Sequence, residues 1–351
     1  MKMNLYQLGK IPWKETQLIY HALALMEKEA LCLVSPSSPY VCIGFHQDLE
    51  QEVDLEFCKE NNIPIFRREV GGGAVFLDGN QLFFQLILKK DNSLVPRRIE
   101  TFYKKFLQPA INVHNQIGIP AQYKPVNDLV VEMRKISGTG AGEIGECIVF
   151  VGNLILDFDY ETMSRVLKIP DEKFRDKVKK TIEENLSTLK REAAARELTL
   201  DDEAGLNRRM AEEFEKLIGP FVPSVIDEPL NQKMQELDSQ MMADKWLYMK
   251  GKKVSGRLVK VRSGLEVIHR MHKTVGGLIR ADFVVNNGRF ERLSISGDIF
   301  CYPHNTLDQL ITSLEGHPID QLVKILNEFY SEQNFEMPGV TFEDWMQVLK
   351  V

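Results

Sequence analysis

Three consecutive glycines at residues 71–73 constrain the fold of this chain more than any other feature of its sequence. They follow Arg67 and Arg68 and precede an apolar run at 74–77 that is typical of a β-strand. Backbone without Cβ atoms lets several N–H groups approach a bulky or anionic ligand, and a neighbouring arginine offers a planar cationic fork. The pattern indicates either a pocket for a small anion or a tight turn between strands beside a solvated arginine pair. A Walker phosphate loop is excluded, because no Gly-Lys-Ser/Thr follows and the next element is a strand.

The length of 351 residues, 44% of them hydrophobic and 27% charged, predicts one large or two ordinary domains with buried cores. Disorder and fibrous repeats are excluded. No apolar run approaches the ~20 residues of a membrane helix, so no membrane partner is expected. The first ten residues lack the apolar region of a signal peptide, which predicts a cytoplasmic protein.

The charge balance argues against nucleic acid as a partner. Fifty acidic and 44 basic residues give a formal net charge of −6, the wrong sign for a broad grip on phosphate backbones. The five cysteines are scattered and contain no C-x-x-C pair, so neither a disulfide framework nor a thiolate zinc site is indicated. We expect reduced and mostly buried thiols at Cys32, Cys42, Cys58, Cys147 and Cys301.

The first half of the chain alternates short strands with helices and glycine turns. Helix formers without internal Gly or Pro predict a helix over 15–30, and a second helix is expected over 55–61. Apolar and β-branched runs predict strands at 31–34, 40–44, 74–77, 81–88, 129–133 and 147–156. These elements indicate a mixed, mostly antiparallel sheet flanked by helices.

The second half is predicted to end in a small α+β domain. A charged helical stretch over 171–217 leads to Pro220, Pro223 and Pro229, which mark a linker and place the domains at 1–228 and 229–351. Beyond it, Asn286-Asn287-Gly288 lies between the apolar runs 278–285 and 290–295, which predicts a hairpin. Helices are expected over 306–314 and 319–330. The predicted fold class is therefore α+β with two domains.

A second segment that could take part in catalysis runs from residue 126 to residue 140. It is expected to form a hairpin whose turn lies at or near residues 132–135. In a closed pocket, the ammonium group of Lys135 can neutralise a carboxylate and a phosphate together, as acyl-adenylate chemistry requires. The alternative is a solvated lysine in an ordinary hairpin.

Other motifs carry less weight. Gly140, Gly142 and Gly145 spell G-x-G-x-x-G, but a strand and not a helix follows, so we reject a Rossmann dinucleotide site and expect a loop beside the pocket. His269 and His272 lack a third ligand nearby in sequence, so a metal site there is disfavoured. Asp298 is interpreted as a turn residue, and Cys147 as a packing residue, because it lies at the edge of an apolar run without a neighbouring base.

Four motifs follow one another in a specific order along the chain. They are Arg67-Arg68-x-x-Gly71-Gly72-Gly73-Ala74-Val75-Phe76, Gly79-Asn80, Asn127-Asp128-Leu129-Val130 and Lys135-Ile136-Ser137-Gly138. Taken together they resemble the lipoate-protein ligase family, within the biotin and lipoate ligase superfamily. The resemblance covers residues 4–217, and the tail around 293–300 is similar to the small C-terminal accessory domain of these ligases.

The resemblance implies a two-step reaction. Lipoate and ATP, with Mg²⁺, would give lipoyl-adenylate and pyrophosphate, and the lipoyl group would pass to a lysine of an acceptor protein. Acceptors implied by the family are the lipoyl domain of a 2-oxoacid dehydrogenase E2, the glycine cleavage H protein or a related lipoate-binding protein. The implied fold is a ligase-like catalytic domain followed by the accessory domain.

By motif position, the resemblance also implies the roles of individual residues. Lys135 matches the catalytic lysine, and Asp128 matches a polar residue near the metal, which implies that it is a Mg²⁺ ligand. The residues that would bind substrate or lipoyl-adenylate are Arg68, Gly71, Gly72, Gly73, Ala74, Val75, Asn80, Asn127, Asp128, Ser137, Gly138 and Gly152. Glu69 and Val70 replace the small hydroxyl residues common in the family, and the stretch 139–152 also departs from its pattern.

Three alternatives stay open. An octanoyl or lipoyl transferase would use an activated acyl group without ATP, and a catalytically silent protein would only bind lipoate. A biotin ligase is disfavoured, because its pocket loop resembles Gly-Arg-Gly-Arg rather than two arginines followed by three glycines.

Overall fold

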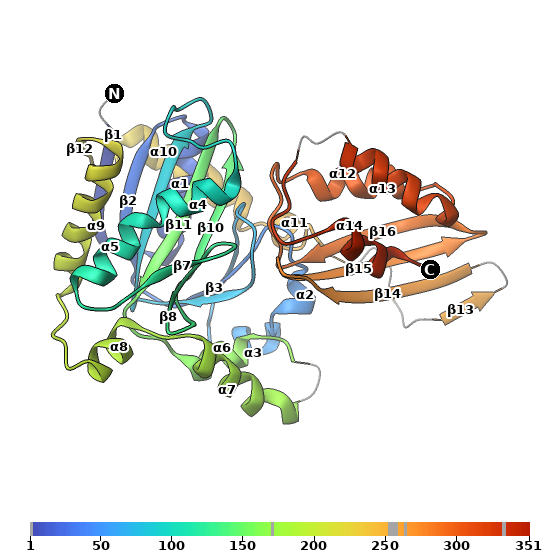
Figure 1. Cartoon of the computed structure of the whole chain (residues 1–351), viewed down its shortest axis with the longest axis horizontal. Coiled ribbons are helices and arrows are strands. Elements are labelled where there is room, and N and C mark those ends of the chain that lie inside the picture. The colour runs from blue at the N-terminus through green and yellow to red at the C-terminus, as the bar shows by residue number, and fades with distance from the viewer. Residues whose placement is uncertain (1–2, 170–171, 252–258, 263–264, 332–334) are drawn as a thin grey trace. The chain divides into compact units, whose positions relative to one another are not determined.

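A computed structural model describes residues 3–169, 172–251, 259–262, 265–331 and 335–351 of the chain (Figure 1). Two predictions include residues outside these ranges: residues 1 and 2 belong to the segment tested for a signal peptide, and residue 171 begins the predicted charged helical stretch. The chain divides into two units. Unit 1 comprises Met1–Cys42, Val53–Phe66 and Val75–Ala243, and unit 2 comprises Ile43–Glu52, Arg67–Ala74 and Asp244–Val351.

A six-stranded sheet is the centre of unit 1, in the order β10-β11-β6-β2-β1-β12. β1 runs parallel to β2 and β12, and the other neighbours are antiparallel. The strands are β1 (Met3–Ile11), β2 (Ala30–Pro36), β6 (Gln81–Lys89), β10 (Thr139–Ile144), β11 (Cys147–Ile155) and β12 (Phe221–Pro223). This mixed, mostly antiparallel sheet confirms the predicted fold class.

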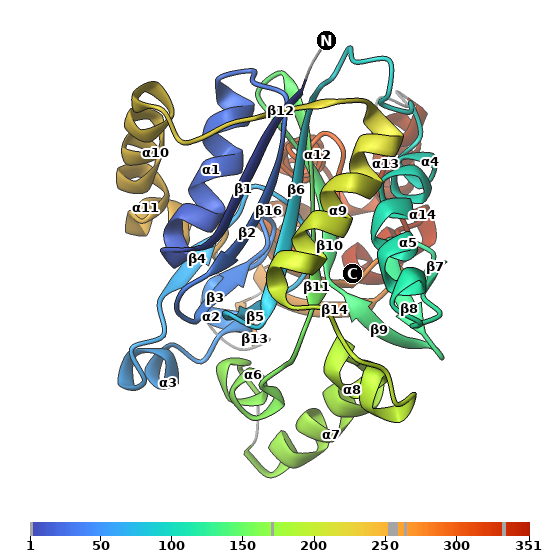
Figure 2. The ribbon, with the colours of Figure 1, turned by 90° about the vertical axis from the view of Figure 1, so that its left-hand side faces the viewer.

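Helices cover both faces of this sheet because successive side chains on a strand point to opposite sides. On β6, Phe84 packs against Phe214, 5.9 Å between ring centroids, whereas Gln85 donates a hydrogen bond of 2.7 Å to the Thr16 carbonyl. Figure 2 shows the result, with α1 and α10 on one side of the sheet and α5 and α9 on the other. The four helices are α1 (Trp13–Leu25), α5 (Gln108–Gln116), α9 (Glu203–Ile218) and α10 (Glu228–Met241). A fifth helix, α4 (Ile99–Phe106), directly precedes α5.

Unit 1 also contains two small three-stranded sheets, except for the strand-end residues Ile43 and Arg67, which belong to unit 2. One has the order β4-β3-β5 and the other the order β7-β8-β9. Their strands are β3 (Tyr40–Ile43), β4 (Ile65–Arg67), β5 (Val75–Leu77), β7 (Gln122–Lys124), β8 (Asp128–Val131) and β9 (Arg134–Ser137). The other helices of this unit are α3 (Leu55–Glu60), α6 (Tyr160–Val166), α7 (Arg175–Asn185) and α8 (Leu189–Ala195), with a 3₁₀ turn at Glu172–Phe174.

Unit 2 is an antiparallel meander with helices packed on its core. The strands are β13 (Val259–Arg262), β14 (Leu265–Lys273), β15 (Leu278–Asn286) and β16 (Arg289–Gly297), in that order. Its helices are α2 (Leu49–Glu52), α11 (Asp244–Leu247), α12 (Thr306–Leu314), α13 (Leu322–Ser331) and α14 (Phe342–Leu349), with a 3₁₀ turn at Ile319–Gln321. Phe283 and Phe290 of the sheet and Trp345 of α14 are fully buried in one core. The small α+β character predicted for the C-terminal part is confirmed.

Several local predictions are also confirmed. Asn287 and Gly288 take positive φ values of 47° and 72° at the turn between β15 and β16, as the hairpin signal predicted. None of the five cysteines forms a disulfide, and all five are buried. The helices expected over 306–314 and 319–330 correspond to α12 and to the 3₁₀ turn followed by α13.

Other predictions were wrong in detail. The first helix ends at Leu25 rather than at residue 30, because Glu27 takes a positive φ of 53° and Ala30 already pairs in β2. The glycine stretch 140–145 is not a loop: it forms most of β10, where the ladder to β11 supplies the hydrogen-bond partners that a glycine-rich segment lacks alone.

The proline-rich segment after residue 219 is more ordered than a linker. Pro223 lies in β12, opposite Leu5 of β1, and Pro229 occupies the first turn of α10, where a missing N–H costs nothing. Because α10 belongs to unit 1, that unit extends beyond residue 228. The assignment of 1–228 and 229–351 to a catalytic and an accessory domain stays a prediction.

The helices in the described part of the chain include none long and apolar enough to cross a membrane.

Gly152 of β11 is predicted to be irreplaceable by alanine. A Cβ at this position would lie 2.2 Å from Cζ of the fully buried Phe84, its partner on β6. Gly152→Ala is expected to lower the free energy of unfolding by about 2 kcal/mol through overpacking, measured by urea denaturation. Gly138→Ala is the matched control, since its Cβ would meet nothing closer than Asn153 Oδ1 at 3.5 Å. Equal stability of the two variants would contradict the packing argument.

Candidate functional site

The hairpin of β8 and β9 carries the predicted catalytic lysine, as expected from the sequence. Its turn consists of Glu132 and Met133, with φ values of 47° and 68°. Lys135 lies opposite Val130 in the ladder, and its Nζ forms an ion pair of 2.7 Å with Asp128 Oδ1. Both side chains keep about a third of their surface exposed, 37% and 30%. The structure therefore brings together two predicted site residues at the open face of one hairpin.

The strand junction after Lys135 is held by buried amides that the sequence did not single out. Asn153 Oδ1 accepts the Gly138 N–H at 2.7 Å, and Asn153 Nδ2 donates to Gln81 Oε1 at 2.8 Å. Both amide side chains are almost fully buried. Because the Gly138 N–H is already bonded, this glycine contributes shape rather than a free donor. The only sequence signal was a polar residue inside an apolar strand.

Asn127 is tied to the same junction. Its Nδ2 donates to the Thr139 carbonyl at 2.8 Å, and Thr139 Oγ1 donates back to the Asn127 carbonyl. Ser137 is fully buried, and its hydroxyl makes a long contact of 3.4 Å with the Gly138 carbonyl. These residues shape the base of the hairpin.

The remaining predicted residues of unit 1 lie elsewhere on its sheets. Asn80 is exposed in the turn between β5 and β6, where Asp78 accepts hydrogen bonds from its backbone and side-chain nitrogens at 2.9 and 3.2 Å. Val75 begins β5, and Gly152 lies in the middle of β11 under the ring of Phe84. The structure gives these residues structural partners, and their contact with a ligand stays a prediction.

In unit 2, Arg67 is a fully buried structural residue. Its Nη1 donates to the carbonyls of Gly44, Phe45 and Gln47 at 2.7–3.1 Å, and its Nε and Nη2 donate to the Leu247 carbonyl. The interpretation of a solvated arginine pair was therefore wrong for this residue, because the planar fork satisfies several buried carbonyls at once.

The triple-glycine loop is closed by Arg68. Its Nη2 donates to the carbonyls of Gly71 and Gly73, at 2.8 and 2.9 Å. Glycine is required at two close backbone contacts: a Cβ on Gly44 would lie 1.9 Å from the Gly72 carbonyl oxygen, and one on Gly71 would lie 2.8 Å from the Ile299 carbonyl oxygen. The Gly72 N–H donates to the Ile299 carbonyl at 3.3 Å. Tight packing against backbone within unit 2 thus explains these glycines without any ligand, and no motif predicted the partners.

Glu69 lies inside the same segment. It is only partly exposed, and burial raises the pKa of its carboxyl to about 7. The adjacent Val70 is fully buried. The two residues that depart from the family pattern therefore change the interior of the loop rather than its solvent surface.

The predicted magnesium ligand has a limited set of neighbours. Among the residues that the structure describes, no three His, Cys, Asp or Glu side chains gather closely enough to hold a metal ion. Asp128 offers one carboxylate, and its Oδ1 is paired with Lys135. This set fits Mg²⁺ only as an ion carried mainly by nucleotide phosphates and water, which is a common way for proteins to bind it.

The residues judged unsuited to catalysis have structural partners. His269 pairs with Asp282 at 2.5 Å and His272 with Asp344 at 2.7 Å. Asp298 lies at a bend after β16, where its carboxylate accepts the Leu278 N–H. Burial raises the pKa of Cys147 to about 11, so its thiol is protonated at neutral pH.

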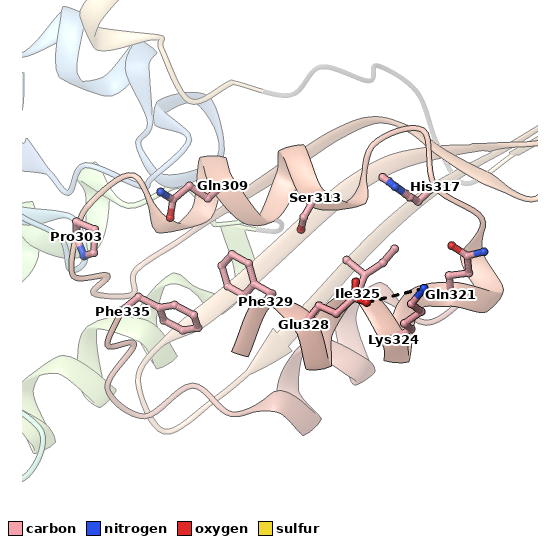
Figure 3. Close-up of a pocket in the computed structure, with 10 residues that line it drawn as sticks. All are labelled: Pro303, Gln309, Ser313, His317, Gln321, Lys324, Ile325, Glu328, Phe329 and Phe335. Carbon is pink, nitrogen blue, oxygen red and sulfur yellow. Dashed lines mark ion pairs between the residues drawn. The ribbon is translucent and has the colours of Figure 1, made fainter. Parts of the chain in front are cut away.

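A cavity of about 570 Å³ lies between α12 and α13 in unit 2 (Figure 3). Phe329 and Phe335 line one end, and Gln321 and Lys324 line the other. None of the predicted site residues contributes to its wall.

The comparison with protein families assigns the chain to one family. Residues 12–215, more than half of the sequence, match the lipoyl protein ligase A/B catalytic domain. The chain belongs to this family. The resemblance that the four motifs carried is confirmed.

Three curated relatives that match the chain are named lipoate-protein ligases. Lipoate-protein ligase A subunit 1 of Thermoplasma acidophilum is 31% identical over 159 residues, 42% of this chain and 59% of that protein. Lipoate-protein ligase LplJ of Bacillus subtilis is 31% identical over 44% of this chain and 45% of its own length. The chain thus spans about half the length of these two relatives. Lipoate–protein ligase 1 of Staphylococcus aureus is 24% identical over 94% of this chain and 90% of that protein.

Solved structures show the same fold. P. falciparum LipL1 in complex with lipoate superposes with a TM-score of 0.68 at 17% identity, covering 95% of both chains. Lipoate-protein ligase A bound with ATP gives a TM-score of 0.58 at 20% identity, covering 71% of this chain and 99% of that one. The bipartite ligase of Thermoplasma acidophilum, described with its E2 lipoyl domain, gives 0.62 at 24% identity, covering 74% and 100%.

The raised pKa of Glu69 predicts a pH-dependent stability. A carboxyl whose pKa is raised in the folded state adds its full contribution to the free energy of unfolding below its unfolded pKa. That contribution to stability is lost as the pH rises through about 7. Glu69→Gln is therefore expected to raise the free energy of unfolding by about 2 kcal/mol at pH 8, and by much less at pH 5, in urea titrations. Glu328→Gln, an exposed residue of α13, is the control. The same effect at both pH values would show that the Glu69 charge is not responsible.

Proposed function

We propose that this protein is an ATP-dependent lipoate-protein ligase. In the first step lipoate and ATP form lipoyl-adenylate and pyrophosphate, and in the second a lysine ε-amine displaces AMP to form an amide. The carrying observation is the Lys135 ammonium, held 2.7 Å from Asp128 on a short, well-anchored hairpin with part of its surface open. Membership of the catalytic-domain family and the ligase relatives support the same reaction.

Lys135 acts in the first step by neutralising charge. The lipoate carboxylate attacks the α-phosphorus of ATP, and negative charge gathers where these two anions meet. A cation positioned there before the reaction stabilises the transition state more than the separate reactants. Asp128 holds the ammonium in place until the substrates arrive, and no nucleophilic side chain is required.

The remaining residues bind the substrate in this proposal. By motif position, the residues that would bind lipoyl-adenylate are Arg68, Gly71, Gly72, Gly73, Ala74 and Val75, and those that would contact its nucleotide part are Asn80 and Asn127. Ser137, Gly138 and Gly152 shape the wall beside Lys135. Two structural neighbours, lipoate-protein ligase A bound with ATP and P. falciparum LipL1 in complex with lipoate, are consistent with these binding roles.

Mg²⁺ bound to the ATP phosphates would supply further positive charge when ATP is bound. Asp128 is the residue that would face the ion, with phosphate oxygens and water supplying the other ligands.

The second step requires an acceptor with a neutral, protruding lysine. Loss of a proton from the ε-ammonium group frees the nitrogen lone pair to attack the acyl carbon. The acyl C–O bond then breaks, AMP leaves with the bridging oxygen, and a second proton is released as the amide forms. A lipoyl domain of a 2-oxoacid dehydrogenase E2 is the first acceptor to test, since one relative is described with such a domain, and the glycine cleavage H protein is the second. Five buried cysteines that form no disulfide support a reducing, cytoplasmic location.

The ligase reaction predicts an ATP-dependent mass increase. Purified protein with ATP, Mg²⁺ and lipoate is expected to add one lipoyl group to an E2 lipoyl domain or H protein, as measured by intact-mass spectrometry. Lys135→Ala is expected to slow pyrophosphate release about 100- to 1000-fold, because the positioned cation is lost at the transition state. Lys104→Ala, an exposed lysine on α4, should retain wild-type rates.

The same assay separates the alternatives. Transfer from an activated octanoyl or lipoyl donor without ATP would identify a transferase instead. Lipoate binding without adduct or pyrophosphate, with Lys135→Ala losing only affinity, would identify a non-catalytic binder.

A further inference from the structure

The Lys135 hairpin is anchored by a second segment of chain that lies far from it in sequence. The Ser187 N–H donates to the Lys135 carbonyl at 2.8 Å, and Lys135 and Leu186 form a parallel β-bridge. Residues 186–187, between α7 and α8, thus run along the open edge of β9. The main chain of Lys135 is therefore attached to a segment outside its own hairpin.

The side chains at this junction converge on Glu192 of α8. Its carboxylate is fully buried and accepts hydrogen bonds from Ser187 Oγ, from Arg134 Nη2 at 3.0 Å and from Arg196 Nη1. Arg134 and Arg196 also contact Glu132 of the turn, at 3.1 and 2.8 Å, but Glu132 is 62% exposed, so these contacts contribute less.

Glu192 is ionised in this environment. Burial by itself raises the pKa of its carboxyl, but the hydrogen bonds from Ser187, Arg134 and Arg196 outweigh burial and hold the pKa below its ordinary value. A buried carboxylate with three donors, two of them cationic, is a rigid anchor, because removal of any partner leaves a charge unsatisfied.

Because side chains alternate between the two faces of β9, the anchor at Glu192 also constrains the orientation of Lys135. Arg134 and Lys135 are consecutive on the strand, so their side chains point to opposite faces. Arg134 is drawn to Glu192 on one face, and Lys135 meets Asp128 on the other. Fixing Arg134 therefore fixes the rotation of the strand and the direction in which the ammonium group points.

We infer that Glu192 is a positioning residue for Lys135, acting through Arg134 on one side and through Ser187 along the strand edge. The inference rests on the proposed function only for its effect on rate. Its effect on the hairpin is independent of the reaction, so the two can fail separately.

Glu192→Gln is the primary test, because it retains the side-chain size and removes the charge. The kcat of lipoate-dependent pyrophosphate exchange should fall about 10- to 100-fold, the range for residues that orient a reacting group, while KM for lipoate and ATP changes less than about threefold. Glu212→Gln, an exposed residue of α9, is the matched control. An unchanged kcat in folded Glu192→Gln would overturn the inference.

A double-mutant cycle separates positioning from general stabilisation. In a Lys135→Ala background, Glu192→Gln should cause no further loss of rate, because the residue through which it acts is absent. A fully additive loss would overturn the inference.

Hydrogen exchange supplies a readout that does not depend on activity. Amides of residues 128–137 should exchange faster in Glu192→Gln and in the milder Ser187→Ala than in the wild-type protein, measured by mass spectrometry without substrates. Unchanged exchange in both variants would overturn the inference even in an active ligase. If the wild-type protein forms no lipoyl-adenylate, the proposed function fails while this measurement still decides the role of Glu192.

Discussion

The alternation of side chains along β9 is the constraint on which the candidate site depends. Arg134 and Lys135 are neighbours in sequence, but the pleat sends one to the buried Glu192 and the other to Asp128. A slip of one residue would exchange the two faces and turn the ammonium group away from its partner. The register that pairs Val130 with Lys135, the positive-φ turn and the bridge to Leu186 all oppose such a slip.

The cationic residues near the motifs illustrate how surroundings divide similar side chains into different roles. Arg67 is fully buried, and its guanidinium group donates to several backbone carbonyls of unit 2, so it stabilises the fold. Lys135 forms an ion pair with Asp128 and keeps 37% of its side chain exposed. A charge that is still partly hydrated can exchange its partner for a substrate anion at small cost, whereas a buried charge cannot.

Local patterns in the sequence predicted the elements that depend on local physics. Asn287-Gly288 specified a turn because few other residues adopt positive φ, and the motif residues 126–137 correctly indicated a hairpin that carries Lys135. The errors arose where segments distant in sequence determine the local structure. Gly140–Gly145 became part of a strand because β11 completes its ladder, and the first helix stopped at Leu25 because the next strand begins at Ala30. Asn153 and Glu192 escaped prediction since each is an ordinary polar residue until another segment packs against it.

By itself the sequence determined the mixed, mostly antiparallel fold class, the turns and the identity of the chemical groups at residues 128 and 135, because periodicity, turn preference and side-chain chemistry are properties of short segments. The tertiary structure alone decided which of these groups are buried, which are paired and which remain open to a ligand. Burial and pairing arise from segments such as 186–192 that are remote in sequence, and the free energy of a charge depends on those neighbours rather than on its own residue type.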